Sequence, residues 1–314
     1  MQRLLRQVLI QSLTQRPGPW LLALSAGLDS SVLLFAIRQL WPEQNVHAVH
    51  VNHGLQDMAD DFEAGARSLC LRLGVECHVS KLHKPEVFEN GLEAWARQAR
   101  YAAIESVARD LKVDTILLAH HADDQAETFF INLIRGTGID GLRGMPAIAR
   151  RNGFLWLRPL LRVHRSVIQE QAKLWKLPWV EDPSNADRVY LRNRIRHELM
   201  PLLEAIRPGA NQRVVHLMQD LAQTREQESG VLAAPSVGSA ELDLGALYGQ
   251  SSQEQRLTLH AWAKKVTQRA PSRARLNAMY ELCFVSKTGR GHLRHGLYVF
   301  RRNGDRLRAE PICD

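Results

Sequence analysis

Short apolar runs and longer amphipathic segments alternate along the first 140 residues. The runs are rich in strand-forming residues, whereas the segments between them repeat their apolar positions with a period of about 3.6, which is typical of helices. The predicted strands are 20–25, 45–52, 75–80 and 114–120, and the predicted helices lie near 29–40, 57–73, 91–111 and 124–135. Strands separated by helices predict right-handed βαβ units, and therefore an α/β fold built on a parallel, doubly wound sheet.

The rest of the chain follows a different pattern. Residues 135–146 are rich in glycine, and the region after them is mostly helical, with loops at its prolines. Residues 228–240 have the composition of a linker, and Asn303-Gly304 between strand-like runs predicts a type I′ hairpin turn. We therefore expect a first domain over 1–215, a helix and linker over 216–240, and a smaller, mostly helical or α+β domain over 241–314.

The composition is that of a soluble globular protein, with 45% hydrophobic and 24% charged residues. No apolar stretch is long enough to span a membrane, and the N-terminal segment is interpreted as an amphipathic helix without an export signal. The four cysteines form neither C-x-x-C pairs nor a dense framework, which argues against a structural zinc site and fits a reducing compartment. We therefore expect a cytoplasmic protein, and a homodimer is compatible with the sequence.

The net charge of +8 is distributed unevenly along the chain. Residues 1–140 carry 13 Lys/Arg and 17 Asp/Glu, a net of −4, whereas residues 141–314 carry 28 and 16, a net of +12. A polyanion such as nucleic acid is the natural partner of so basic a half. The alternative is a basic surface that only keeps the protein in solution.

Polar clusters follow three of the predicted strands. They are the segments Ser25–Ser30, Asn52-His53 and His120–Asp124. Because ligands bind beyond the carboxyl ends of the strands in parallel sheets, we expect these clusters to converge on one crevice.

The turn Ser25-x-Gly27-x-Asp29-Ser30 joins the first predicted strand to its helix. Small residues let backbone N–H groups approach an anion, and the helix N-terminus adds partial positive charge, so the turn suits a phosphate group. Asp29 suits a phosphate only through a cation, and we assign it to Mg²⁺. The alternative is that Ser30 or Asp29 simply caps the helix.

The pattern S-x-G-x-D-S after a first strand resembles the pyrophosphatase loop of the N-type ATP pyrophosphatases, the PP-loop family, whose usual form is S-G-G-x-D-S. Ala26 replaces the first glycine here, and its methyl group fits if the residue keeps φ below zero. The resemblance implies the PP-loop fold, ATP as substrate and release of pyrophosphate. The ATP-binding residues that it implies are Ser25, Ala26, Gly27, Leu28, Asp29, Ser30, Asn52 and His53.

Five further motifs make the chain resemble the tRNA(Ile)-lysidine synthetase family. They lie at 49–55, 96–101, 119–145, 158–161 and 181–199. Members adenylate C2 of the wobble cytidine in a tRNA(Ile) with a CAU anticodon. L-Lysine then displaces AMP to form lysidine, which changes the decoding from Met to Ile. The resemblance therefore implies an ATP-dependent ligase that forms a carbon–nitrogen bond.

Asp124 and Glu127 lie three residues apart near the start of a predicted helix, so they share one face. The resemblance makes them, with His120, the site for L-lysine, where they could also take a proton from the attacking amine. The alternative is that Asp124 and Glu127 are a capping pair favoured by the helix dipole. Both roles can coexist.

The chain also offers basic side chains for two roles, one at the nucleotide and one at the tRNA. By the resemblance, Arg100 faces the nucleotide and stabilises charge on the α-phosphate; otherwise it is an exposed helix arginine. Within a basic helical portion over about 145–215, tRNA contacts are expected from Arg192, Asn193, Arg194 and Arg196, and the alternative is a solvated helix face. The basic cluster 287–302 is a second candidate surface for tRNA. The catalytic candidates are Asp29, Arg100, His120, Asp124 and Glu127.

Three rival functions compete with this interpretation. A PP-loop tRNA thiolase also adenylates a base, but it typically depends on paired cysteines, and Cys70 and Cys77 are interpreted as core thiols. An amidotransferase-type synthetase needs a glutaminase domain, for which the chain has no room. A non-catalytic RNA-binding protein with a decayed loop is favoured by Ala26 alone. The residues that argue against it are the intact Ser25, Asp29, Asp124 and Glu127.

Overall fold

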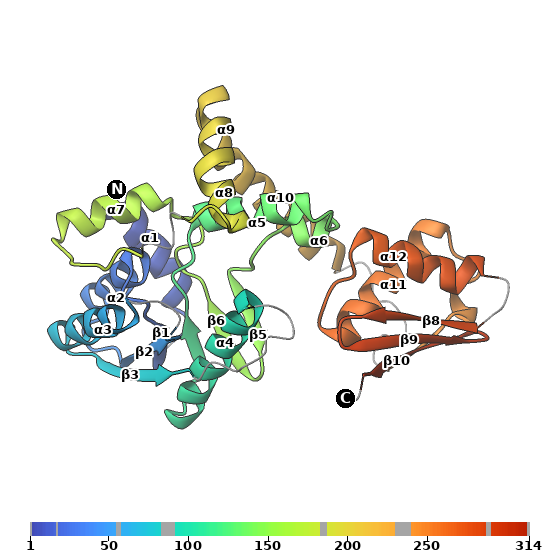
Figure 1. Ribbon diagram of the computed structural model, residues 1–314, viewed down its shortest axis with the longest axis horizontal. Coiled ribbons are helices and arrows are strands. Elements are labelled where there is room, and N and C mark those ends of the chain that lie inside the picture. Colours follow the sequence, from blue (N-terminus) through green and yellow to red (C-terminus); the bar gives the residue numbers. More distant parts are fainter. Residues whose placement is uncertain are drawn as a thin grey trace. The chain divides into compact units, whose positions relative to one another are not determined.

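The computed structural model of the protein describes residues 2–16, 18–54, 58–82, 92–182, 187–229, 240–286 and 290–312. The chain divides into two compact units, which Figure 1 shows in sequence colours. The first unit consists of residues 1–127 and 145–215, and the second of residues 128–144 and 216–314. A short segment in the first half of the chain thus belongs to the same unit as the C-terminal part.

A six-stranded sheet forms the centre of the first unit. Its strand order is β3 (Glu76–Lys81), β2 (Val46–Asn52), β1 (Trp20–Ala23), β4 (Thr115–Leu117), β6 (Phe154–Leu157) and β5 (Ile148–Arg151). All neighbours pair in parallel except the edge strand β5, which is antiparallel to β6. The predicted parallel α/β sheet is confirmed. Its four predicted strands correspond to β1–β4, and the β5–β6 hairpin was not predicted.

Helices cover both faces of this sheet (Figure 1). Apolar residues of α1, α2, α3 and α7 pack with strands β1 and β2 in one buried cluster. Helix α4 packs on the opposite face, where Tyr101 lies 4.8 Å from the ring of Trp156. No helix among the described residues is long and apolar enough to cross a membrane. The helices of this part of the chain are α1 (Gln2–Leu13), α2 (Leu28–Leu40), α3 (Ala59–Leu73), α4 (Leu92–Asp110), α5 (Ala122–Ile134, which ends in the second unit), α7 (Arg165–Leu174), α8 (Leu191–Arg194), η2 (Ile195–Leu199) and α9 (Met200–Ile206).

The second unit has its own core and an antiparallel sheet, as expected for an α+β domain. The strand order is β7 (Glu241–Asp243), β10 (Arg306–Pro311), β9 (Tyr298–Asn303) and β8 (Arg290–His295). Trp262 and Phe300, both fully buried, lie 5.3 Å apart in its core. Its helical elements are α6 (Ile139–Leu142), α10 (Ala210–Ser229, which begins in the first unit), η3 (Gly245–Leu247), α11 (Ser252–Thr267), α12 (Arg273–Tyr280) and η4 (Glu281–Val285).

Two sequence interpretations fall partly outside the described residues. Of the predicted linker 228–240, residues 228 and 229 end helix α10, residue 240 precedes β7, and 230–239 are not described. Of the basic cluster 287–302, residues 290–302 contribute β8 and most of β9, whereas 287–289 are not described.

The tetrapeptide Arg-Arg-Asn-Gly occurs at two hairpins and forms two different turns. Between β5 and β6, Arg151 pairs with Phe154, so the loop is Asn152-Gly153, and both residues have positive φ (50° and 86°), as a type I′ turn requires. Between β9 and β10, Asn303 itself pairs with Arg306. The loop there is Gly304-Asp305, and of its two residues Gly304 alone has a positive φ. The type I′ turn predicted at Asn303-Gly304 is therefore wrong, because the strand includes Asn303.

Gly153 provides a test of the unpredicted hairpin. A Cβ added there would meet no atom within 4 Å, so the cost of Gly153→Ala is conformational, on the order of 1 kcal/mol for an L-residue in the left-handed region. Gly153→Asn should cost less, because asparagine tolerates that region better. Urea denaturation of both variants measures the two losses. Equal losses would contradict the turn assignment.

Candidate functional site

A cavity of about 570 Å³ opens at the carboxyl ends of β1, β2 and β4. Its position fits the point where the strand order reverses, since β1 lies between β2 and β4. The three predicted polar clusters converge on it. Among its lining residues are Ser25, Asp29, Ser30, Asn52, His53, Arg100, His120, Asp124 and Arg192.

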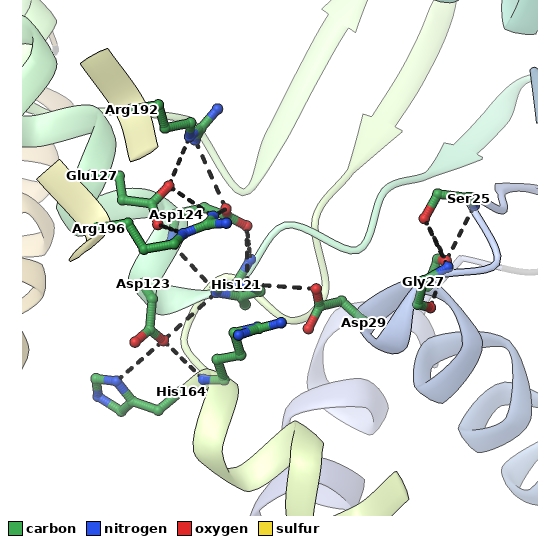
Figure 2. Close-up of polar contacts among 12 residues, drawn as sticks. Ser25, Gly27, Asp29, His121, Asp123, Asp124, Glu127, His164, Arg192 and Arg196 are labelled. Atoms are coloured by element: carbon green, nitrogen blue, oxygen red, sulfur yellow. Dashed lines mark hydrogen bonds and ion pairs between the residues drawn. The ribbon is translucent and has the colours of Figure 1, made fainter. Parts of the chain in front are cut away.

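The side chains of the turn after β1 form hydrogen bonds within the turn and do not cap the start of helix α2. Gly27 is the N-cap of α2 and has an extended conformation, and no described side chain makes a capping bond there. Ser30 Oγ donates to the carbonyl of Gly27 (3.2 Å), accepts from the backbone N–H of Ser25 (3.1 Å) and lies 3.0 Å from Ser25 Oγ (Figure 2). The alternative that Ser30 or Asp29 caps α2 is therefore not supported. An uncapped helix N-terminus is a ready site for an anion.

Ala26 has φ of +61°, so the condition stated for its methyl group to fit, a φ below zero, is not met. An alanine in this region costs about 1–2 kcal/mol relative to right-handed backbone. Two contacts hold it there: its carbonyl accepts from the N–H of Val180 (3.0 Å), and its methyl group is buried in the main core. The loop therefore keeps a conformation for which glycine is the usual residue.

His121, next to the predicted His120, is surrounded by three carboxylates (Figure 2). Its Nε2 lies 3.7 Å from Asp29 Oδ2 and 3.5 Å from Asp124 Oδ2, and its Nδ1 lies 3.6 Å from Asp123 Oδ2. Burial opposes protonation of His121. The hydrogen bond with Asp123 and the charges of Asp124 and Asp29 outweigh it and raise the pKa above the usual value. The imidazole of His121 therefore links Asp29 to the start of α5.

Asp123 is held from two further sides. Its Oδ2 accepts from the backbone N–H of Arg165 at 2.8 Å and lies 3.7 Å from Nδ1 of His164. Burial disfavours the carboxylate, yet hydrogen bonds from His121, His164 and the Arg165 N–H hold the pKa of Asp123 well below its usual range. The His164–Asp123 hydrogen bond also raises the pKa of His164. The start of α7 is thereby fastened to the start of α5.

The pKa of Asp29 is shifted in the opposite direction to that of Asp123. Burial, together with the negative charge of Asp124, raises its pKa despite the nearby His121. Its Oδ1 is buried and has no hydrogen-bond partner among the described residues. A buried carboxylate oxygen without a donor is costly, and a bound cation or ligand would satisfy it.

Glu127 is almost completely buried and binds two of the arginines predicted to contact tRNA. Arg192 Nε donates to its Oε2 at 2.7 Å, and Arg196 Nε donates to its Oε1 at 2.6 Å. Nη2 of each arginine also lies 3.8 Å from Asp124 Oδ1. Arg192 and Arg196 are four residues apart and so share a helix face. Glu127 is not among the residues that line the cavity, whereas Asp124 and Arg192 are.

The other two predicted tRNA contacts lie in different surroundings. Asn193 is buried, and its amide donates to the carbonyl of Asp187 at 2.7 Å. Arg194 is exposed and pairs with Glu198 one turn along (3.4 Å). Of the four residues, Arg194 is thus the one directed to solvent.

The capping alternative applies to Asp124. Its Oδ2 accepts from the backbone N–H of His121 at 3.0 Å. This bond satisfies the N–H group of the N-cap residue of α5. Asp124 therefore caps helix α5 and also lines the cavity.

Two neutral histidines border the cavity. Burial, opposed by the charge of Asp124, lowers the pKa of His120 to about 3. Burial and the nearby Arg100 lower the pKa of His53 to about 4. Nδ1 of each ring is buried and meets no hydrogen-bond partner in the part of the chain that the structure describes. Both rings can therefore offer hydrogen bonds to a bound nucleotide or base at neutral pH.

Sequence reasoning missed His121, Asp123 and His164. The run His-His-Ala-Asp-Asp at 120–124 contained the signal, since His121 and Asp124 stand in N-cap and N3 positions. Nothing local in the sequence places His164 beside Asp123, because their contact joins segments 41 residues apart.

The parallel sheet, the uncapped turn after β1 and the cavity beside it define a PP-loop nucleotide-binding protein. A family model described as a PP-loop domain matches residues 1–203, and a model described as the TilS substrate binding domain matches residues 242–308. The chain is 34% identical over 280 residues to the tRNA(Ile)-lysidine synthase of Polaromonas naphthalenivorans, covering 87% of this chain and 83% of that protein. The chain belongs to the tRNA(Ile)-lysidine synthase family.

Relatives in the family differ in length. The chain is 39% identical over 218 residues to the tRNA(Ile)-lysidine synthase of Hydrogenovibrio crunogenus, but the match covers 67% of this chain and 51% of that protein. The chain thus spans about half the length of that relative. Among solved structures, the U34-tRNA thiolase NcsA from Methanococcus maripaludis is similar, with a TM-score of 0.60 and 18% identity over 70% of this chain and 78% of that one. At this identity the likeness concerns the fold alone.

The ion pairs of Glu127 predict that substitutions of Arg196 and Arg194 have very different effects on stability. Arg196→Gln leaves a buried carboxylate with one of its two partners, so we expect a loss of about 3 kcal/mol in the free energy of unfolding. Arg194→Gln removes only an exposed pair and should change stability by less than about 0.5 kcal/mol. Urea denaturation of both variants checks this, and similar losses would contradict the buried cluster.

Asp123→Asn should destabilise the protein in a pH-dependent way. The lowered pKa of Asp123 adds stability above its unfolded value of 3.8, which is lost as the pH falls. The raised pKa of His121 adds stability below its unfolded value of 6.5, which is lost as the pH rises through the folded pKa. The stability difference from wild type, about 2 kcal/mol, should therefore be largest between about pH 4 and 6.5. Denaturation curves at pH 5 and pH 8.5 measure it; an unchanged difference would be inconsistent with the pair.

Proposed function

We propose that the protein ligates L-lysine to C2 of the wobble cytidine in tRNA(Ile) with a CAU anticodon, using ATP. The cytidine carbonyl oxygen attacks the α-phosphorus, and pyrophosphate leaves. The ε-amine of lysine then attacks C2, and AMP leaves as the lysidine forms. Membership of the tRNA(Ile)-lysidine synthase family supports this activity, and so does the site at the ends of β1, β2 and β4.

The observation that carries the proposal is the uncapped start of α2 beside an unpartnered oxygen of Asp29. The first N–H groups of the helix suit the β- and γ-phosphates of ATP, and no lysine is needed because those phosphates leave intact. The adenosine would extend toward Asn52 and His53, which line the same cavity. Ser25, Ala26, Gly27, Leu28 and Ser30 shape the turn that holds the phosphates.

Asp29 fits the role of magnesium ligand. Its Oδ1 is a buried acceptor without a donor, and carboxylate oxygens are the ligands that Mg²⁺ prefers. When bound, Mg²⁺ would neutralise part of the phosphate charge. Asp29 itself is kept in place by His121, whose Nε2 lies 3.7 Å from Asp29 Oδ2.

For L-lysine we propose Asp124 and His120 as the groups at the cavity wall. Asp124 is a carboxylate whose pKa stays below its usual value, because His121, His120 and Arg192 together outweigh the effect of burial. It can therefore bind an ammonium group at neutral pH. Glu127 is proposed to act one step back, since both its oxygens are held by Arg192 and Arg196.

For the adenylation step we propose that Arg100 and Arg192 provide positive charge. Both line the cavity from different elements, Arg100 from α4 and Arg192 from α8. Each can stabilise negative charge that develops on the α-phosphate. For tRNA we propose Arg194 as an outward contact, with Arg196 and Asn193 fixing the position of that helical segment.

A thiolase-like activity is less well supported. Cys70 belongs to the apolar core that α3 forms with the sheet, and neither Cys70 nor Cys77 is among the residues that line the cavity. Hydrogen bonding to Cys77, followed by burial, raises the pKa of the Cys70 thiol. A protonated, buried thiol is a poor nucleophile or sulfur carrier.

Asp29→Asn tests the proposal. With tRNA(Ile) transcript, ATP and radiolabelled lysine, wild type should form AMP and transfer label to the tRNA. The variant should lose on the order of 100-fold in both rates. Asp60→Asn, which removes an exposed carboxylate from the first turn of α3, is the matched control and should retain full activity. Undiminished AMP formation by a folded Asp29→Asn sample would overturn the mechanism, and no label in tRNA with wild type would overturn the function.

A further inference from the structure

His47, Glu76 and His78 converge on one face of the sheet, away from the cavity. His47 on β2 pairs in register with Glu76 on the edge strand β3. His78 is two residues beyond Glu76, so it emerges on the same face. The two imidazoles are half-buried, and the carboxylate is the most exposed of the three.

The spacing of their polar atoms is that of ligands around a small ion. His47 Nδ1 lies 3.2 Å from Glu76 Oε2 and 3.5 Å from His78 Nε2, and His78 Nε2 lies 3.6 Å from Glu76 Oε1. A tetrahedral ion with bonds of about 2.0–2.1 Å separates its ligand atoms by roughly 3.3–3.4 Å. Across the described ranges of the chain, these residues make up the one group of three such side chains whose ligand atoms all lie within 4.8 Å of one another.

We propose that His47, Glu76 and His78 form a site for Zn²⁺. Two imidazoles and one carboxylate are a donor set that zinc accepts, with water as the fourth ligand. The expectation against a structural zinc site was drawn from the cysteines, whereas these ligands are nitrogen and oxygen.

The site is separate from the catalytic cavity. None of the three residues is among those that line the cavity. Val49, the cavity-lining residue of β2 nearest to His47 in sequence, lies two residues further along the strand and pairs with His78. Zinc bound here would link the edge strand β3 to β2 through its ligands. It would therefore stabilise the sheet without touching ATP.

Isothermal titration of the full chain with ZnCl₂, after dialysis against a chelator, tests the proposal. One equivalent should bind, with a dissociation constant on the order of 1 µM or below. With zinc about 100-fold above that constant, the melting temperature should rise on the order of 5 °C. His78→Ala and the isosteric Glu76→Gln should each weaken binding roughly 100-fold.

Two control variants separate this site from other possible ligands. Cys77→Ser changes the residue between Glu76 and His78 and should leave binding unchanged. His216→Ala removes an exposed histidine from α10 and should also leave it unchanged. Absence of binding to wild type would overturn the proposal. So would equal binding by wild type, His78→Ala and Glu76→Gln, or loss of binding in Cys77→Ser.

Discussion

Charged side chains from four separate segments meet in one largely buried cluster at the end of the sheet, and each is stable there because others neutralise it. Four carboxylates, on Asp29, Asp123, Asp124 and Glu127, face two arginines and two histidines. Hydrogen bonds and charges of the carboxylates raise the pKa of the two histidines, His121 and His164. An unpaired charge at such depth would cost several kcal/mol. The cluster therefore fixes α2, α5, α7 and the α8–η2 segment relative to one another within the first unit.

That constraint explains how the site is prepared for a ligand. The cluster uses Asp29 Oδ2 but leaves Oδ1 without a partner, and the neighbouring helix start has no side-chain cap. Both are unsatisfied polar features, and both face the same cavity. A triphosphate with a divalent cation complements them together: its oxygens meet the N–H groups, and the cation meets the carboxylate. The strained backbone at Ala26 fits the same account, since the loop shape is retained although glycine is absent.

The fold could be predicted from the sequence more completely than the site. Strands β1–β4 and helices α2–α5 follow from apolar periodicity, which reports burial directly. The β5–β6 hairpin did not, and its Asn152-Gly153 signal has the same letters as Asn303-Gly304, where the loop begins one residue later. Identical tetrapeptides give different turns because the pairing of the flanking strands, which is not local, decides which residues form the loop.

Some residues of the site could likewise be predicted from local sequence patterns, and others could not. Those that end strands or begin helices, such as Asp29 and Asp124, could be predicted to meet because parallel strands end at one edge. The partners of Glu127 could not, because Arg192 and Arg196 read as a basic helix face and reach it across more than 60 residues of chain. Local sequence patterns locate a ligand site, but they do not reveal which charged side chains are paired with one another in a buried cluster.

The most direct measurement is a crystal structure of the protein with Mg²⁺ and an ATP analogue whose α,β-bridging oxygen is replaced by methylene. The account predicts the β- and γ-phosphates on the N–H groups at the start of α2, a metal ion on Asp29 Oδ1, and the adenine beside Asn52 and His53. A nucleotide bound elsewhere on the protein, with this cavity holding only water, would contradict it.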